Sequence, residues 1–199
     1  MTIRKPTDER RREIADAAIR IIGERGLREF TAAHLAAEVG ITDGTIFRHF
    51  KDMSEVISAA LDRLPALMWA AAPASGDPLE RLEAFVLHRL RSMAIQPGIQ
   101  SLVFSDQISH ALGGDGPARV AQLRNRSRDL LRSCLRDAAE QGMLRPDLDL
   151  EAAVVLVTGT VMGFLFALKD GALPAPASEM ELRCWQTLRT ALVRPQVVS

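Results

Sequence analysis

The sequence contains no tyrosine and only two cysteines among its 199 residues, and its acidic and basic side chains cancel to a formal net charge of zero. Cys134 and Cys184 lie far apart, without a Cys-x-x-Cys or Cys/His spacing, so neither a disulfide framework nor a zinc site is expected. We predict that both are small buried hydrophobic residues, with a redox-sensing thiol as the alternative. Because the chain has no overall basic charge, any binding of nucleic acid depends on a local patch.

Catalytic motifs are missing as well. The sequence has no Gly-x-Ser-x-Gly, no His-Glu-x-x-His and no paired carboxylate–histidine spacing. The glycine-rich stretch 113–116 lacks both a following Lys-Ser/Thr and a preceding strand, so it is not a phosphate-binding loop. We therefore predict that the protein is not an enzyme, and we expect no catalytic residue, no metal ligand and no cofactor.

Two segments bear on location. Residues 1–9 are polar and charged, which is unlike a signal peptide. The apolar stretch 152–168 is short for a membrane span and is interrupted by Thr158, Gly159, Thr160 and Gly163. We predict a helix buried between neighbours in a cytoplasmic protein, with no membrane contact.

The remaining apolar residues follow the 3.6-residue period of helices, and sustained strand alternation does not occur. We therefore predict an all-α fold, with Pro65 kinking or interrupting the fourth helix. Three helices crowd into the first fifty residues, which indicates a small N-terminal domain (1–52) and a larger C-terminal helical domain (53–199). The expected helices cover about 7–25, 32–39, 43–49, 54–71, 78–96, 99–110, 117–141, 150–169 and 178–193.

The stretch 31–53 has the pattern of a helix-turn-helix. Small Ala36 allows a second helix to cross closely, and Gly40 stands where the chain must turn sharply. Thr42 is expected to cap the second helix with its side chain. The apolar residues that would share a core between the two helices are Leu35, Val39, Ile41 and Ile46.

The second of these helices carries groups that suit DNA. A recognition helix reads base edges near its N-terminus, and short polar or small residues stand there: Thr42, Asp43, Gly44 and Thr45. Arg48, His49 and Lys51 follow and can donate to phosphates or bases, whereas Phe50 is expected in the core. Arg4, Lys5 and the basic run 10–12 could reach flanking phosphates, although 10–12 could equally form a salt-bridged face.

Two motifs here resemble the TetR/AcrR transcriptional regulators: Leu35-Ala36-Ala37-Glu38-Val39-Gly40, and Phe47-Arg48-His49-Phe50. The close resemblance covers about residues 10–60, and the connector 142–149 is also similar. It implies a one-component regulator, most simply a repressor, in which 42–45 face bases and Phe47, His49 and Lys51 lie at the phosphate backbone. We count Thr31, which opens the motif, with the DNA-binding residues. The family commonly has Tyr in place of Phe47 and Lys in place of Met53, so two phosphate contacts are absent here.

The resemblance also implies a homodimer on palindromic double-stranded DNA and a small-molecule effector bound in the C-terminal domain. An effector would stabilise one orientation of the helix 54–71 and so change the spacing of the recognition helices. The candidate pocket residues, each of which could instead be plain core, are Met68, Trp69, Phe85, His88, Met93, Phe104, Gln107, Met162 and Phe166, with His110 as a further polar contact. The candidate dimer residues on the last two helices are Gly159, Gly163, Leu182, Trp185 and Leu188. The competing interpretation is an interaction protein that uses the same scaffold to inhibit another protein.

Overall fold

The computed structural model of the chain describes residues 6–69, 75–96, 98–104 and 114–194. Over these residues it contains nine α-helices and one short 3₁₀-helix, and the only β-type pairing is an isolated bridge between Leu144 and Val193. The all-α prediction is therefore confirmed. The chain forms two compact units, one of residues 1–67 with 96–124 and the other of residues 68–95 with 125–199. The division after residue 52 stays a prediction about which part binds DNA.

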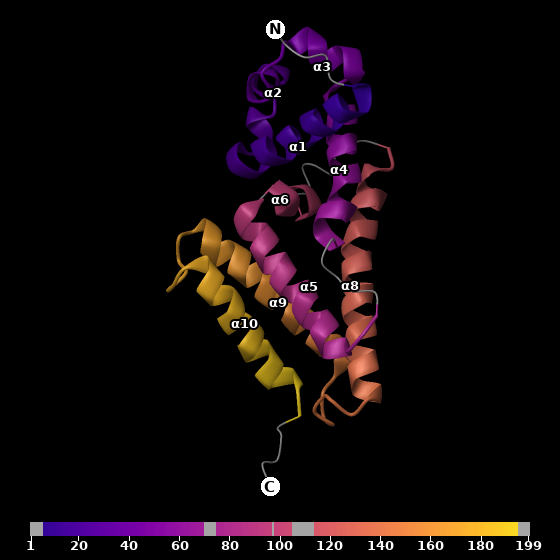
Figure 1. Cartoon of the computed structure of the whole chain (residues 1–199), viewed down its shortest axis with the longest axis vertical. Coiled ribbons are helices and arrows are strands. Elements are labelled where there is room, and N and C mark those ends of the chain that lie inside the picture. Colours follow the sequence, from indigo (N-terminus) through magenta and orange to yellow (C-terminus); the bar gives the residue numbers. More distant parts are fainter. Residues whose placement is uncertain (1–5, 70–74, 97, 105–113, 195–199) are drawn as a thin grey trace. The chain divides into compact units, whose positions relative to one another are not determined.

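The first unit begins with three helices whose bounds agree with the sequence prediction (Figure 1). Local signals explain the agreement, because Gly26 ends the first helix and Thr31 caps the second through its hydroxyl. Of the two outcomes predicted for Pro65, an interruption of the fourth helix is wrong, since α4 continues through it, and a kink stays a prediction. The elements are α1 (Thr7–Arg25), η1 (Leu27–Glu29), α2 (Ala32–Val39), α3 (Asp43–His49), α4 (Met53–Trp69) and α6 (Gly98–Phe104).

An apolar core joins the helices of this unit. Its largest fully buried side chains include Ile14, Ile21, Leu35, Ile46 and Phe50. Helix α6 packs against α1 so closely that a Cβ atom on Gly98 would collide with the carbonyl group of Ile19. Glycine is therefore the residue that this approach of two backbones requires.

The second unit contains α5 (Pro78–Ile95), the greater part of α8 (Gly116–Glu140), α9 (Leu150–Lys169) and α10 (Ala177–Leu192). Helices α5, α9 and α10 pack on one another (Figure 1). Their shared core includes Leu82, Phe85, Val157, Trp185 and Leu188. Asp77 and Asp149 cap α5 and α9, because each carboxylate accepts a backbone N–H of the first helical turn.

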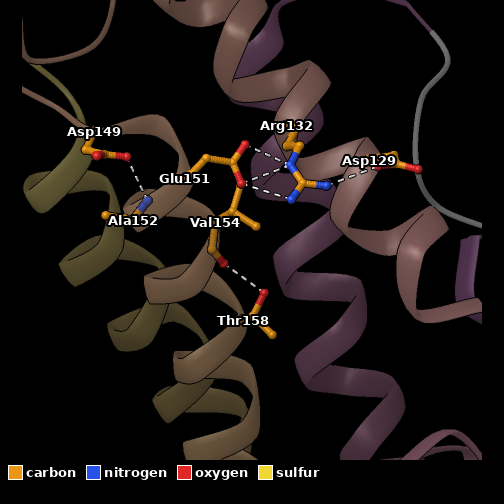
Figure 2. Close-up of polar contacts among 7 residues, drawn as sticks. All are labelled: Asp129, Arg132, Asp149, Glu151, Ala152, Val154 and Thr158. Atoms are coloured by element: carbon orange, nitrogen blue, oxygen red, sulfur yellow. Dashed lines mark hydrogen bonds and ion pairs between the residues drawn. The ribbon is translucent and has the colours of Figure 1, made fainter. Parts of the chain in front are cut away.

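The start of α9 is fixed at two points (Figure 2). The Asp149 carboxylate accepts the N–H of Ala152 at 3.0 Å. Glu151 receives two nitrogens of Arg132 from α8, with Nε–Oε1 at 2.8 Å and Nη2–Oε2 at 2.9 Å. Asp129 holds the same guanidinium at 3.2 Å. This bidentate pairing ties the start of α9 to α8, while the buried residues Val154, Val157 and Val161 set which side of α9 faces the unit.

The outward side of α9 is apolar. Val155 exposes 71% and Phe166 exposes 58% of their surface, and Gly159 and Gly163 face open space. The hydroxyl of Thr158 donates to the Val154 carbonyl within the helix at 2.8 Å (Figure 2), so it adds little polarity.

Helix α9 has a mean hydropathy of 2.0 and is long and apolar enough to cross a membrane by length and composition. Only 33% of its most apolar window is buried in the protein. The sequence predicted that this helix is buried between neighbours. Within the described residues of the chain, that burial is incomplete.

The turn between α2 and α3 depends on Gly40, which adopts a left-handed conformation with φ 73° and ψ 38°. There the N–H of Ile41 donates to the Ala36 carbonyl at 2.9 Å, which satisfies an otherwise unpaired group at the end of α2. The sequence prediction of a sharp turn at this glycine is confirmed.

Replacing Gly40 with alanine should destabilise the protein by about 1–2 kcal/mol, because a Cβ atom is disfavoured in the left-handed region. The free energy of unfolding in urea measures the effect. Gly44→Ala is the matched control, since Gly44 lies within α3 without a positive φ and alanine favours helices by up to about 1 kcal/mol. A Gly40→Ala protein as stable as the unaltered one would contradict this account of the turn.

Candidate nucleic-acid interface

Helix α3 presents one face to the core and the other to solvent. Ile46 and the following Phe50 are buried, with 0% and 2% exposure, so the prediction that Phe50 belongs to the core is confirmed. Thr42, Asp43 and Gly44 are exposed at the start of the helix. Nothing lies within 4 Å of the position that a Cβ atom would take on Gly44. The beginning of the helix is therefore open to a large ligand.

A short chain of polar contacts runs along this exposed face. The hydroxyls of Thr42 and Thr45 lie 3.0 Å apart, and Arg48 Nη2 donates to the Thr45 hydroxyl at 3.4 Å. Thr42 occupies the capping position, but its side chain makes no capping hydrogen bond, so that prediction is wrong. Its hydroxyl turns instead toward Thr45, one helical turn away. The three side chains form a polar edge that can exchange these weak contacts for base edges.

The end of α3 is held by Arg11 of α1. The Arg11 guanidinium lies 4.1 Å from the centre of the Phe50 ring and donates to the His49 carbonyl. It also pairs with the Glu55 carboxylate of α4 at 2.7 Å. One side chain thus joins three helices at the point where the recognition helix ends.

Glu55 completes this junction from the other side. Its second carboxylate oxygen accepts the N–H of Lys51 at 2.6 Å, and its own N–H is capped by Asp52 at 2.9 Å. The Lys51 N–H and the Arg11 hydrogen bond lower the pKa of Glu55, so the carboxylate is ionised at neutral pH. The backbone N–H groups of Lys51 and Glu55, near the start of α4, therefore already donate to carboxylates of the chain.

The basic run of α1 is divided between two roles. Arg10 is 8% exposed and pairs with Glu13 at 2.8 Å, and Arg11 holds α3. Of the two interpretations left open by the sequence, the salt-bridged face describes these two residues. Arg12 is exposed and forms no ion pair within the described part of the chain. Arg4 and Lys5 lie outside the described residues.

The remaining candidates surround this face. Phe47 is 48% exposed, which is unusual for a large apolar side chain, and Lys51 is exposed beside it. Burial, and then the charges of Arg48, Arg10 and Arg11, lower the pKa of His49, so the ring is neutral near pH 7. It acts there as a hydrogen-bonding group rather than a cation.

Thr31 lies at the other end of the motif. Its hydroxyl accepts the His34 N–H at 3.2 Å as the cap of α2. The residue is exposed. Because its hydroxyl oxygen is already used by the cap, a ligand would meet mainly the rest of the side chain.

The candidate pocket residues do not form one group. Met68 and Phe85 are buried, and Trp69 and Met162 are partly buried in the second unit. Phe104 and Phe166 expose 38% and 58% of their surface. The His88 ring lies 3.4 Å from the Ser92 hydroxyl. The side chain of Met93 and the residues Gln107 and His110 lie outside the described part of the structure.

The candidate dimer residues also divide. Gly159, Gly163 and Leu182 are exposed on α9 and α10. Trp185 and Leu188 are only 4% and 3% exposed because they fill the core of their own unit, and their part in a dimer stays a prediction. The spacing of Leu182, Trp185 and Leu188 in the sequence indicates an apolar face on α10, but it does not indicate which helix packs against that face.

Burial raises the pKa of both cysteine thiols, which favours the inert interpretation over the redox-sensing one. Among the residues that the structure describes, no group of histidine, cysteine, aspartate and glutamate is arranged to hold a metal ion.

Comparisons with known proteins agree with the motif and the fold. Residues 14–60 match the family model for bacterial regulatory proteins of the tetR family. The chain is 27% identical over 174 residues to the HTH-type transcriptional regulator AcrR of Shigella flexneri, covering 81% of this chain and 79% of that one. It is 26% identical over 148 residues to the HTH-type transcriptional repressor KstR2 of Rhodococcus jostii, covering 72% of each. The resemblance to TetR/AcrR regulators is thus confirmed.

A solved structure supports the fold of the rest of the chain. AibR, in complex with isovaleryl coenzyme A and operator DNA, superposes with a TM-score of 0.71 at 21% identity and covers 94% of this chain and 99% of that one. At this identity the similarity establishes the helical fold.

The junction at Glu55 gives a pH-dependent prediction. A Glu55→Gln protein should be less stable than the unaltered one at pH 7, by up to about 1 kcal/mol for a partly exposed ion pair. Because the folded-state pKa of Glu55 is lowered, its contribution is present above the ordinary pKa and is lost as the pH falls through the folded-state value. Melting temperatures between pH 7 and pH 3 should converge at the acid end. A gap that stays constant over this range would show that ionised Glu55 does not stabilise the junction.

Proposed function

We propose that this chain, which carries the DNA-binding domain of the tetR family of bacterial regulatory proteins, is a cytoplasmic transcriptional repressor released by a small-molecule effector. It binds palindromic operator DNA as a homodimer. The observation that carries the proposal is the exposed face of α3, where Thr42, Asp43, Thr45 and Arg48 stand outward beside an open glycine.

The chemistry of this face suits the major groove. Asp43 can accept from the amino group of a cytosine, and the threonine hydroxyls can pair with either donors or acceptors. Arg48 forms no ion pair within the described residues and is free to reach a guanine or a phosphate. Gly44 allows the backbone to approach closely. Lys51, Arg12 and the neutral His49 lie where they would contact flanking phosphates.

A double substitution tests the recognition helix. Thr45→Glu with Arg48→Glu should weaken binding to operator DNA by at least about 100-fold, because it removes two donors and places negative charge against phosphates. Fluorescence anisotropy at fixed salt measures the affinity.

The matched control lies on α8. Asn125 and Arg128 are exposed and have the same spacing, and Arg128 donates to Asn125 at 3.4 Å, as Arg48 does to Thr45. Asn125→Glu with Arg128→Glu changes the charge by the same amount and should leave the affinity within about threefold. Equal losses in both double variants would mean that overall charge, not α3, governs binding.

The exposed apolar face of α9 supports a homodimer. An apolar surface of this extent on a soluble protein marks an interaction site. Its exposed residues recur at helical spacing and include no charge between Ala152 and Phe166. They are Ala152, Val155, Leu156, Gly159, Gly163 and Phe166.

A groove beside this face continues onto α10. Its volume is about 260 Å³, and it is lined by Leu156, Thr160, Met180, Cys184 and Ala191 among others. A second copy related by a two-fold axis would lay its own α9 and α10 against these residues as a four-helix bundle. The partner would also supply the burial that α9 lacks within one protomer.

Val155→Glu should convert the dimer to a monomer at micromolar concentration, since it would bury two carboxylates near the symmetry axis. Sedimentation velocity measures the state. Ile95→Glu is the control, because Ile95 at the end of α5 is 76% exposed against 71% for Val155 but lies off the α9 face. An unaltered protein that sediments as a monomer, or a Val155→Glu protein that remains dimeric, would refute this interface.

Two of the similar proteins and the core of the second unit support release of DNA by an effector. KstR2 is named as a repressor, and AibR was solved with isovaleryl coenzyme A and operator DNA. We infer that a small molecule enters the helical unit beside Phe85, Trp69 and Met162 and changes the orientation of α4, which runs from the DNA-binding domain to Trp69.

A further inference from the structure

Arg89 of α5 is a charged residue in the core of the second unit. It is 6% exposed and belongs to the stripe of Leu82, Phe85 and Leu90 that faces inward. A guanidinium removed from water loses several kcal/mol of solvation unless a counter-charge replaces it. Its position therefore needs an explanation that an apolar core does not give.

The contacts of Arg89 compensate only weakly for the solvation that its guanidinium loses on burial. Its Nη2 donates to the Ser127 hydroxyl of α8 at 3.1 Å, and its Cζ lies 5.6 Å from the centre of the Phe85 ring. Both partners are neutral. Burial alone lowers the pKa of Arg89 to about 10, with no carboxylate among the causes, so the group stays protonated at pH 7.

Other arginines of the same unit show the usual arrangement. Arg81 pairs with Asp137 at 2.9 Å, Arg91 with Glu181 at 3.1 Å and Arg132 with Glu151 at 2.8 Å. Each is more exposed than Arg89 and each has a carboxylate. Among the described residues, the most deeply buried guanidinium of the unit thus forms no ion pair, whereas these three more exposed ones do.

A second donor lies near the same turn of α8. The Nε1 atom of Trp69 is buried and has no hydrogen-bond partner among the described residues. Arg126 lies over the Trp69 ring at 4.3 Å, and Ser127, which holds Arg89, is the next residue along the helix. Two buried donors without a strong acceptor among the described residues favour an acceptor supplied by a bound molecule.

We propose that Arg89 binds the carboxylate of the effector, and that the effector is a monocarboxylate with an apolar body. The charge argues for a monoanion: of the buried charged residues described in this unit, Glu181 is already paired with Arg91, which leaves one positive charge to neutralise. A phosphate dianion would leave a net negative charge in the core. The core of this unit, which includes Phe85, Val86 and Leu131, is apolar, which suits a hydrocarbon chain or ring.

This inference rests on the proposed effector-released repressor and names the chemical class of its ligand. Straight-chain monocarboxylates from hexanoate to dodecanoate serve as probes, each beside its methyl ester and the alkyl phosphate of equal length. Isothermal titration calorimetry measures binding to the full-length protein, and anisotropy measures release of operator DNA. The acids should bind and release DNA, whereas the esters and the phosphates should bind at least about tenfold more weakly.

Arg89→Met keeps the length of the side chain and removes the charge. It should weaken binding of the best carboxylate at least about tenfold and raise the melting temperature of the ligand-free protein, because an uncompensated charge leaves the core. A merely structural Arg89 would instead lower the melting temperature. Arg128→Met, on the exposed face of α8, is the control and should bind the carboxylate as the unaltered protein does. Arg89→Gln replaces Arg89→Met if the latter fails to fold.

The outcomes separate the two levels of the proposal. Failure of the unaltered protein to bind any duplex DNA would remove the repressor itself. Intact DNA binding without binding of any carboxylate, or equal binding by acid and ester, would overturn the role of Arg89 alone. An Arg89→Met protein that binds the acid as tightly as the unaltered protein would overturn that role in the same way.

Discussion

The proposed DNA-binding face depends on the Arg11 guanidinium, which ties three helices together where α3 ends. Helix α3 has only seven residues, too few to be stable alone in water. Its geometry is therefore set by what holds its two ends, the left-handed turn at Gly40 before it and the Arg11–Glu55 pair after it. Base recognition requires side chains placed within a fraction of an ångström, so a short helix fixed at both ends is suited to the task.

A second ion pair between helices lies in the second unit, at the start of α9. Arg132 and Glu151 pair at the start of α9, a helix with an apolar face that the described residues leave exposed. In the first unit charged groups are used to rigidify a small surface that must stay exposed. In the second unit they lie at the start of a helix whose exposed apolar surface we propose to be buried in a dimer. A dimer contact of this kind would hold two copies of α3 at a fixed separation, which operator recognition needs.

Local signals made the N-terminal half predictable. Gly26, Thr31 and Gly40 each mark a helix end through chemistry confined to neighbouring residues, so the bounds of α1, α2 and α3 follow from the sequence. Long-range contacts were not predictable: nothing in the basic run shows that Arg11 meets Phe50. A clue was present, because Arg10 and Arg11 continue the inward stripe of α1 through Ile14, and Arg89 likewise stands on an apolar stripe. A charged residue at a core position is the signal that sequence reasoning overlooked.

The central claim is that two copies of α3 read two copies of one short sequence in adjacent major grooves. The most direct test selects duplexes from a random pool with the purified protein at physiological salt and sequences those retained. The account predicts enriched palindromes whose half-sites are centred about one helical turn, roughly 10 base pairs, or a small multiple of it apart. Retention without any enriched sequence, or enrichment of a single unrepeated site, would contradict it.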